Sequence, residues 1–188
     1  MEAPKSDTSG LLGSAFLDDL PPSILSARQT SAGTSCGGAS TMSERAARDE
    51  RRENFLWWTK ISSRWADCDA YGHVNNATYY SWFDTALTLL AIERGILCAP
   101  GQTSIGLCIA SECEFLAPVG FPETVDIGIR LGRLGSSSIT YELAMFGEAA
   151  DKASAVCKFT HVYVDAETRA KVSLTEEQRS AIGDLLRN

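Results

Sequence analysis

The residues best suited to chemistry lie in one short segment, 64–76, which reads Arg-Trp-Ala-Asp-Cys-Asp-Ala-Tyr-Gly-His-Val-Asn-Asn. Two carboxylates, Asp67 and Asp69, and the imidazole of His73 stand directly before an apolar stretch. A carboxylate can attack a carbonyl carbon or activate water for that attack. The free N–H groups at a helix start can stabilise the oxyanion that forms. The segment therefore predicts carbonyl chemistry at the beginning of a helix.

Each of these residues also has a structural explanation. Aspartates favour Asx turns, and Asn75 or Asn76 would serve as a helix N-cap. One cap does not require two carboxylates, a glycine, a histidine and two asparagines, so the combination favours chemistry. For His73 both interpretations stay open, because it would either orient a catalytic group or bond the loop backbone. We expect His161, in the stretch 155–164, to be a satisfied core histidine.

The helix that positions this segment is predicted at 75–94. Apolar side chains recur there at helical spacing on nearly every face, and Gly95 supplies the stop signal. A helix that is apolar nearly all round must be covered by other structure. We therefore expect this helix to be wrapped by a sheet.

The rest of the chain predicts that sheet. A first strand begins near Phe55, and clean alternation in two of the later stretches indicates an antiparallel sheet with one solvent-exposed face. A capping box from Thr175 to Gln178 predicts a last helix that ends at Leu186. The predicted fold class is α+β, and the four later strands are expected at 104–114, 123–134, 137–147 and 153–165.

Residues 1–54 differ in composition from the rest of the chain. They are rich in Ser, Thr, Gly, Ala and Pro and show no sustained apolar periodicity. We predict a disordered N-terminal extension at 1–54 and a single domain at 55–188. Acidic residues in the extension disfavour a mitochondrial address, so we expect an intracellular and mainly cytoplasmic protein, with mitochondria and other organelles left open.

The overall composition argues against several classes of protein. The formal net charge of −7 disfavours a nucleic-acid binder, and the sequence lacks an apolar run long enough for a membrane span. The six cysteines form no Cys-x-x-Cys pair, and there are only two histidines. We expect no metal and no cofactor.

The motif at 67–76 resembles that of the 4-hydroxybenzoyl-CoA thioesterase-like family of hotdog-fold proteins. The resemblance covers roughly 57–186. It implies a hotdog fold, in which a curved antiparallel sheet wraps around one long central helix. It also implies a homodimer or homotetramer whose substrates are thioesters of coenzyme A or of an acyl carrier protein. The resemblance rests further on Tyr79, Trp82, Asp84, Ala86, 112–118, 134–138 and 160–165.

The resemblance also implies roles for individual residues. The second aspartate of the motif is catalytic in one branch of the family, which points to Asp69 as nucleophile or general base, with His73 and Asn75 beside it. Helix carboxylates, used in other branches, do not match well at Asp84 or Glu93. The implied substrate-binding residues are Gly72, Val74, Asn76, Tyr79, Ile105, Gly106, Arg133, Ser136 and Ser137.

Alternatives remain at two levels. The turn that contains Arg133 and Ser136 is the nearest candidate for coenzyme phosphates, but an ordinary solvated hairpin explains it as well. The whole site would serve a thioester hydrolase, which is the function we predict. A hydratase or dehydratase of acyl thioesters, with His73 as its histidine, and a non-catalytic acyl-CoA-binding module are the alternatives.

Overall fold

The computed structural model describes residues 49–97 and 101–186. Contacts divide the chain into two units, 1–38 and 39–188, and all described residues belong to the second. The predicted extension at 1–54 therefore lies almost entirely outside the described residues. Its last six residues, 49–54, are described and contact the sheet. The domain boundary at 55 stays a prediction.

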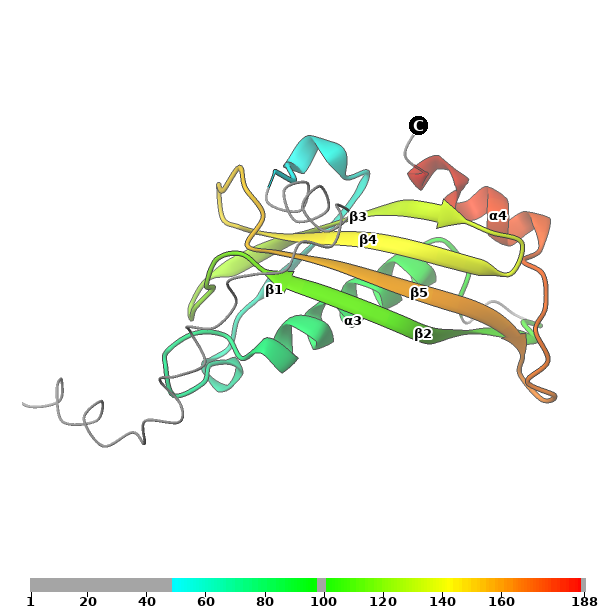
Figure 1. The fold of residues 1–188 in the computed structure, drawn as a ribbon, viewed down its shortest axis with the longest axis horizontal. Helices are drawn as coiled ribbons and strands as arrows, with labels where there is room; N and C mark the ends of the chain where they lie inside the picture. Colours follow the sequence, from blue (N-terminus) through cyan, green and yellow to red (C-terminus); the bar gives the residue numbers. More distant parts are fainter. Residues whose placement is uncertain (1–48, 98–100, 187–188) are drawn as a thin grey trace, which may run out of the picture. The chain divides into compact units, whose positions relative to one another are not determined.

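The described strands form one five-stranded antiparallel sheet in the order β1-β3-β4-β5-β2 (Figure 1). The α+β class is confirmed, and each of the four later predicted strands begins and ends within two residues of its expected bounds. Within the described ranges, no helix is both long and apolar enough to cross a membrane. The elements are η2 (Arg52–Asn54), β1 (Trp57–Ser62), η3 (Trp65–Asp67), α3 (Asn76–Glu93), β2 (Ser104–Phe115), β3 (Thr124–Leu134), β4 (Ser138–Gly147), β5 (Ala155–Asp165), α4 (Glu176–Ile182) and η4 (Gly183–Leu185).

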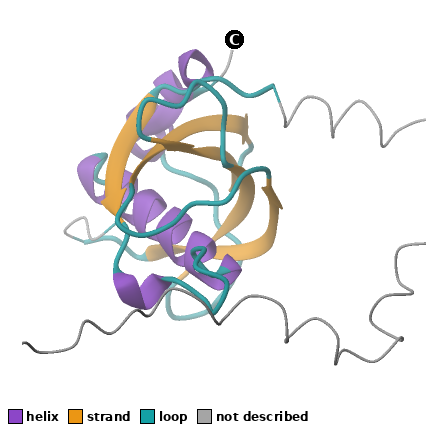
Figure 2. Cartoon of the chain, turned by 90° about the vertical axis from the view of Figure 1, so that its left-hand side faces the viewer, coloured by secondary structure: helices purple, strands orange, loops and turns teal. Residues whose placement is uncertain are grey.

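Helix α3 packs against the inner face of this sheet (Figure 2). Its buried side chains recur at spacings of three and four residues, which places them on one side of the helix. Leu89 and Ile92 on another side are 43% and 54% exposed. Within one chain the helix is therefore covered by the sheet on one side, whereas the prediction required cover over nearly every face. The buried residues are Tyr79, Trp82, Phe83, Ala86, Leu87 and Leu90.

The outer face of the sheet is covered over β3 and the end of β4, so the predicted solvent exposure is wrong there, whereas Lys158 of β5 and Glu112 of β2 remain exposed on the same face. Phe55 lies over this face, 5% exposed, with its ring 5.9 Å from that of Phe146. A Cβ added at Gly128 would lie 2.7 Å from Phe55 Cβ, so the glycine makes room for this contact. Arg130 is 4% exposed beneath the Phe55 ring and forms ion pairs with Glu50 and Glu142. The alternation of β3 places Arg130 on the face that was expected to be polar and exposed. Its burial depends on Glu50, a partner distant in the sequence, and was therefore not predicted.

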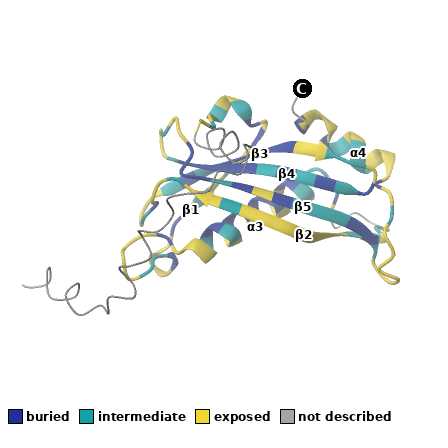
Figure 3. Cartoon of the chain, in the orientation of Figure 1, coloured by how far each residue is buried: buried dark blue, intermediate teal, exposed yellow. Residues whose placement is uncertain are grey.

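Strand β2 contrasts with the centre of the sheet. It forms one edge, pairs only with β5 among the described residues, and is exposed along most of its length (Figure 3). Ile109 is 63% exposed and Phe115 is 43% exposed. A long edge strand with exposed apolar side chains is a site at which another chain can pair.

Replacing Phe55 by alanine tests the importance of the covered outer face. We expect Phe55→Ala to lower the free energy of unfolding by about 3–5 kcal/mol, because it removes a buried ring and leaves a cavity above Arg130. Urea denaturation followed by tryptophan fluorescence measures this change. Leu56→Ala is the matched control, since Leu56 is 53% exposed and should change stability by about 0.5 kcal/mol or less. Equal effects of the two variants would contradict the packing argument.

Candidate active site

The loop before α3 is fixed at both ends by backbone hydrogen bonds. Ser63 N donates to Glu123 O at 2.9 Å, and Val74 N donates to Val119 O at 2.8 Å. Val74 is 2% exposed, so its side chain also anchors the loop in the core. The loop that contains the candidate residues is therefore attached to the connection between β2 and β3.

Asp67 is a structural residue of this loop. Its carboxylate is 3% exposed and accepts hydrogen bonds from the Arg64 backbone and guanidinium, each with a shortest distance of 2.7 Å. Its carbonyl oxygen accepts the Asn75 N–H at 2.9 Å. The hydrogen bonds from Arg64 hold the pKa of Asp67 below its usual range. Asp67 thereby connects the start of the loop to the start of the helix.

Asp69 lies in a tight turn closed by the bond from its own N–H to His73 O, at 2.8 Å. Its Oδ1 accepts the Tyr71 N–H at 2.8 Å, which is the predicted Asx turn. Gly72 has a φ of +79°, a conformation that favours glycine. Asp69 is half-buried, whereas the neighbouring Gly72 and His73 are exposed. The turn holds the Asp69 carboxylate by one oxygen and leaves Oδ2 for other chemistry.

Asn75 is the N-cap of α3, which agrees with the structural explanation that Asn75 or Asn76 caps the helix. Its Oδ1 accepts the Ala77 N–H at 2.9 Å, and its carbonyl accepts the Thr78 N–H at 2.8 Å. Two amides of the first turn are thus used within the cap. Among the described residues of this turn, the backbone N–H of the exposed Asn76 receives no hydrogen-bond acceptor from the Asn75 cap. Tyr79, one turn further on, is 3% exposed and contacts the ring of Phe115 at a centroid distance of 5.2 Å.

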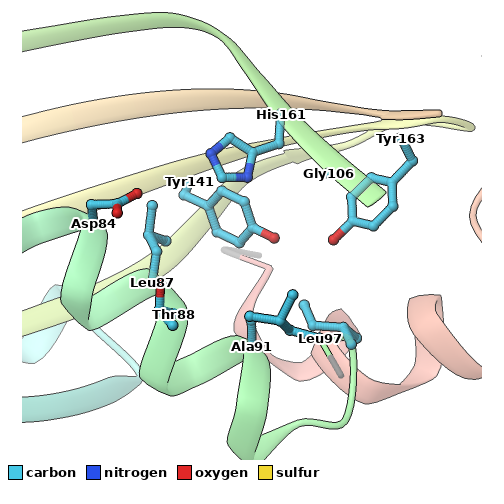
Figure 4. Close-up of a pocket in the computed structure, with 10 residues that line it drawn as sticks. Asp84, Leu87, Thr88, Ala91, Leu97, Gly106, Tyr141, His161 and Tyr163 are labelled. Atoms are coloured by element: carbon cyan, nitrogen blue, oxygen red, sulfur yellow. The ribbon is translucent and has the colours of Figure 1, made fainter. Parts of the chain in front are cut away.

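Gly106 lies at the other end of α3 and lines a cavity of about 170 Å³ (Figure 4), whereas its neighbour Ile105 is not one of the lining residues. Gly106 lines this cavity opposite Tyr163, and a Cβ at Gly106 would lie 3.3 Å from the Tyr163 ring. The walls come from α3, the segment after it, β2, β4 and β5. The lining residues are Asp84, Leu87, Thr88, Ala91, Ile96, Leu97, Gly106, Tyr141, His161 and Tyr163.

The cavity has polar groups that the sequence analysis missed. His161 Nε2 is buried and has no hydrogen-bond partner among the described residues, which differs from the expected satisfied core histidine. Burial lowers the pKa of His161, against a smaller opposing effect of Asp84, which faces it from α3 (Figure 4). Burial also raises the pKa of Tyr141, and the Tyr141 and Tyr163 hydroxyls point toward one another. The sequence contained one signal of this cavity: Tyr141, His161 and Tyr163 all lie on the apolar face of an alternating strand.

The predicted phosphate-binding turn lies at the same end of the sheet as this cavity. Tyr163 N donates to Ser137 O at 2.9 Å, which fixes the turn against β5. Ser137 is 4% exposed, whereas Arg133 and Ser136 are exposed. Arg179 of α4, which the sequence analysis did not single out, donates from Nη1 to Gly135 O at 2.7 Å. The turn therefore has the exposed Arg133 at its beginning and the Arg179 guanidinium at Gly135.

The predicted site residues thus form two groups at opposite ends of α3 and of the sheet. One end contains the Asp69 loop and Phe115, the last residue of β2. The other end contains Gly106 and the turn at 133–138, close to the first residues of β2. A strand of twelve residues extends roughly 40 Å. A single chain does not bring the two groups together.

A family model for the thioesterase-like superfamily matches residues 63–182, which include both groups. The chain belongs to the thioesterase-like superfamily. The structure of PA5185 from Pseudomonas aeruginosa is 45% identical, covers 73% of this chain and 96% of its own, and has a TM-score of 0.70. PA2801 from the same organism, described as a proposed thioesterase, is 28% identical, with 68% and 98% coverage and a TM-score of 0.63.

A more distant relative in structure carries an assigned substrate. The DHNA-CoA thioesterase from Staphylococcus aureus is 18% identical, covers 68% of this chain and 88% of its own, and has a TM-score of 0.61. At this identity the likeness shows the fold alone. Membership of the thioesterase-like superfamily supports thioester hydrolysis as the general activity of this chain.

The loop of this thioesterase-like protein should respond to pH through Asp67. Because its folded-state pKa is lowered, Asp67 contributes stability above the unfolded pKa of about 3.9 and loses it as pH falls through the folded value. We expect Asp67→Asn to be less stable than wild type at pH 7, with the difference shrinking below about pH 4. Urea denaturation at several pH values measures it. A difference that is independent of pH would contradict the role given to the ionised carboxylate.

Proposed function

We propose that the protein hydrolyses an acyl-CoA or acyl-carrier-protein thioester to a free acid and a thiol, with Asp69 as nucleophile or general base. The observation that carries this proposal is the half-buried Asp69 carboxylate, held by one oxygen six residues before Asn75 caps the helix. As a base, Asp69 would take a proton from water while the hydroxide adds to the carbonyl carbon, and the tetrahedral adduct would then expel the thiolate, which takes up a proton. As a nucleophile, it would add to the carbonyl carbon and displace the thiolate to form a mixed anhydride, which water then hydrolyses to the free acid and the Asp69 carboxylate.

The start of α3 would stabilise the oxyanion of either path. The Asn76 amide is the group that the Asn75 cap leaves open, and the partial positive charge of the helix start lies at the same place. His73 and the cap residue Asn75 would position the carbonyl or the water. Gly72 allows the sharp turn that holds these groups close together.

The two groups of site residues would act together in a homodimer, which is also the building block of a tetramer. An antiparallel pairing of β2 with β2 of a second copy would place the beginning of one strand beside the end of the other. The Asp69 loop of one protomer would then lie near Gly106 and the cavity of its partner. The exposed side chains Ile109 and Leu107 of β2 support this pairing.

The cavity would receive the acyl group in this arrangement. At about 170 Å³ it is close in size to an engineered 150 Å³ cavity that binds benzene. Its volume is therefore of the order that one aromatic ring occupies. The coenzyme phosphates would lie outside, near Arg133, Arg179 and the exposed Ser136 of the turn, while Ser137 supports the turn through its backbone. Arg130 is not available for phosphate, because Glu50 and Glu142 neutralise it.

Asp69→Asn tests the catalytic assignment. We expect turnover of acyl-CoA substrates to fall by about 10²–10⁴, because the amide has no basic or nucleophilic oxygen. A thiol-detecting reagent with a panel of acyl-CoAs measures the rate, and circular dichroism verifies the fold. Asp151→Asn, an exposed position on the β4–β5 connection, is the control and should retain wild-type turnover. Near-normal rates for Asp69→Asn would rule out the proposed role.

Mixing two inactive variants tests the shared site. Gly106→Val should inactivate the enzyme by pressing on the Tyr163 ring, and Asp69→Asn should inactivate it by removing the base. If the site combines two protomers, a mixed dimer contains one intact site, so co-refolding equal amounts should restore about a quarter of wild-type activity. Sedimentation verifies the dimer. Two variants that stay inactive when mixed, although they form mixed dimers, would place the whole site within one chain.

An acyl-thioester hydratase or dehydratase is the second candidate. His161 and Asp84 face each other across the cavity, which provides a histidine and a carboxylate that the sequence analysis did not pair. Enzymes that add or remove water beside a thioester need such an acid–base pair. Enoyl absorbance after incubation with a β-hydroxyacyl-CoA, measured separately from thiol release, distinguishes the two activities. Binding without either reaction would instead indicate an acyl-CoA-binding module.

A further inference from the structure

Two cysteines lie opposite each other on neighbouring strands. Cys113 of β2 and Cys157 of β5 are directly paired residues in the antiparallel ladder. Cys157 is 4% exposed and Cys113 is half-buried against the same core cluster, so both face the side on which α3 packs. The other described cysteines lack this relation, because Cys108 is paired with a histidine and Cys68 with a valine.

The backbone geometry suits a disulfide between them. Directly opposed Cα atoms in an antiparallel ladder lie about 4.5 or about 5.5 Å apart, according to the type of pair. Disulfides span Cα separations of roughly 4.4–6.8 Å. Both types of pair meet this condition. The irregularity of the β2–β5 ladder lies between Cys108 and Ala110, so pairing is regular around Cys113.

We propose that Cys113 and Cys157 form a modification site that hydroperoxides oxidise to an intramolecular disulfide. The Cys113 thiolate attacks a peroxide oxygen, which gives a sulfenic acid and hydroxide. The Cys157 sulfur then attacks the sulfenic sulfur, and its proton leaves with the hydroxyl group as water. Two thiols are oxidised and one hydrogen peroxide is reduced to two waters. The proposal does not depend on the proposed thioesterase activity.

The local environment determines the order of these steps. A hydrogen bond with Cys157 lowers the pKa of Cys113, and the same contact together with burial raises the pKa of Cys157. Cys113 is therefore the better thiolate, and it is also the more accessible of the two. The bond would join the edge strand β2 covalently to β5, near the Phe159 ring that contacts Tyr80 of α3. A thiol reductant would reverse it.

Peptide mapping of the full-length, reduced protein tests the site. The protein is treated with hydrogen peroxide, its remaining thiols are alkylated, and it is digested with trypsin, which cuts after Lys152 and Lys158 and releases Cys157 in peptide 153–158. We expect this peptide to be linked to peptide 95–130, with fragmentation placing the bond at Cys113. The linked species should lose two hydrogens in mass and disappear after dithiothreitol treatment.

Matched variants separate this pair from the other cysteines. Cys113→Ser and Cys113→Ala should abolish the link, whereas Cys108→Ser, in the same strand and the same tryptic peptide, should retain it. Thermal unfolding verifies that each variant folds, and the alanine variant decides the result if serine disturbs the fold. The proposal is overturned if the link persists without Cys113. It is also overturned if peroxide yields only links between chains or over-oxidised Cys113 with Cys157 still reduced.

Discussion

The packing of α3 against the inner face of the sheet is the constraint on which the rest of the structure depends. The side chains that it buries, Phe83 and Leu90 among them, fix where the helix begins and how far it runs along the sheet. Its beginning positions the Asn75 cap and hence the Asp69 turn. Its second half forms one wall of the cavity. Moving the helix by one turn, about 5.4 Å, would displace both features at once.

The features that could be predicted from the sequence are those that depend on residues close to each other along the chain. The Asn75 cap and the Thr175 capping box depend on residues within a few positions of each other, and both occur as predicted. The alternation of β3 and β4 likewise identified the strands, since it reports directly which side chains face the core. The prediction of an antiparallel sheet that packs against a helix follows from these signals.

Features that depend on distant partners were not predictable in the same way. Nothing near Arg130 in the sequence indicates that Glu50, eighty residues earlier, neutralises it, so its face of β3 was expected to be wet. The cavity depends on Gly106 of β2 meeting His161 and Tyr163 of β5 across the sheet, and the histidine was interpreted as a satisfied core residue. Each residue had an ordinary local explanation. Only the pairing register places their polar atoms around a common space.

The distance between the Asp69 turn and the residues around Gly106 constrains any mechanism more than the types of residue at either place. A thioester carbonyl occupies one point, whereas the Asp69 turn and Gly106 lie at opposite ends of an 18-residue helix of about 27 Å. No rotation of side chains closes such a gap within one chain. The edge strand β2 is the element that runs between the two ends, and its ladder with β5 leaves its other edge open among the described residues. An antiparallel twofold contact along that edge exchanges the two ends. Strand β2 separates the two groups within one chain. Pairing of β2 with β2 of a second copy would therefore bring the groups of the two chains together.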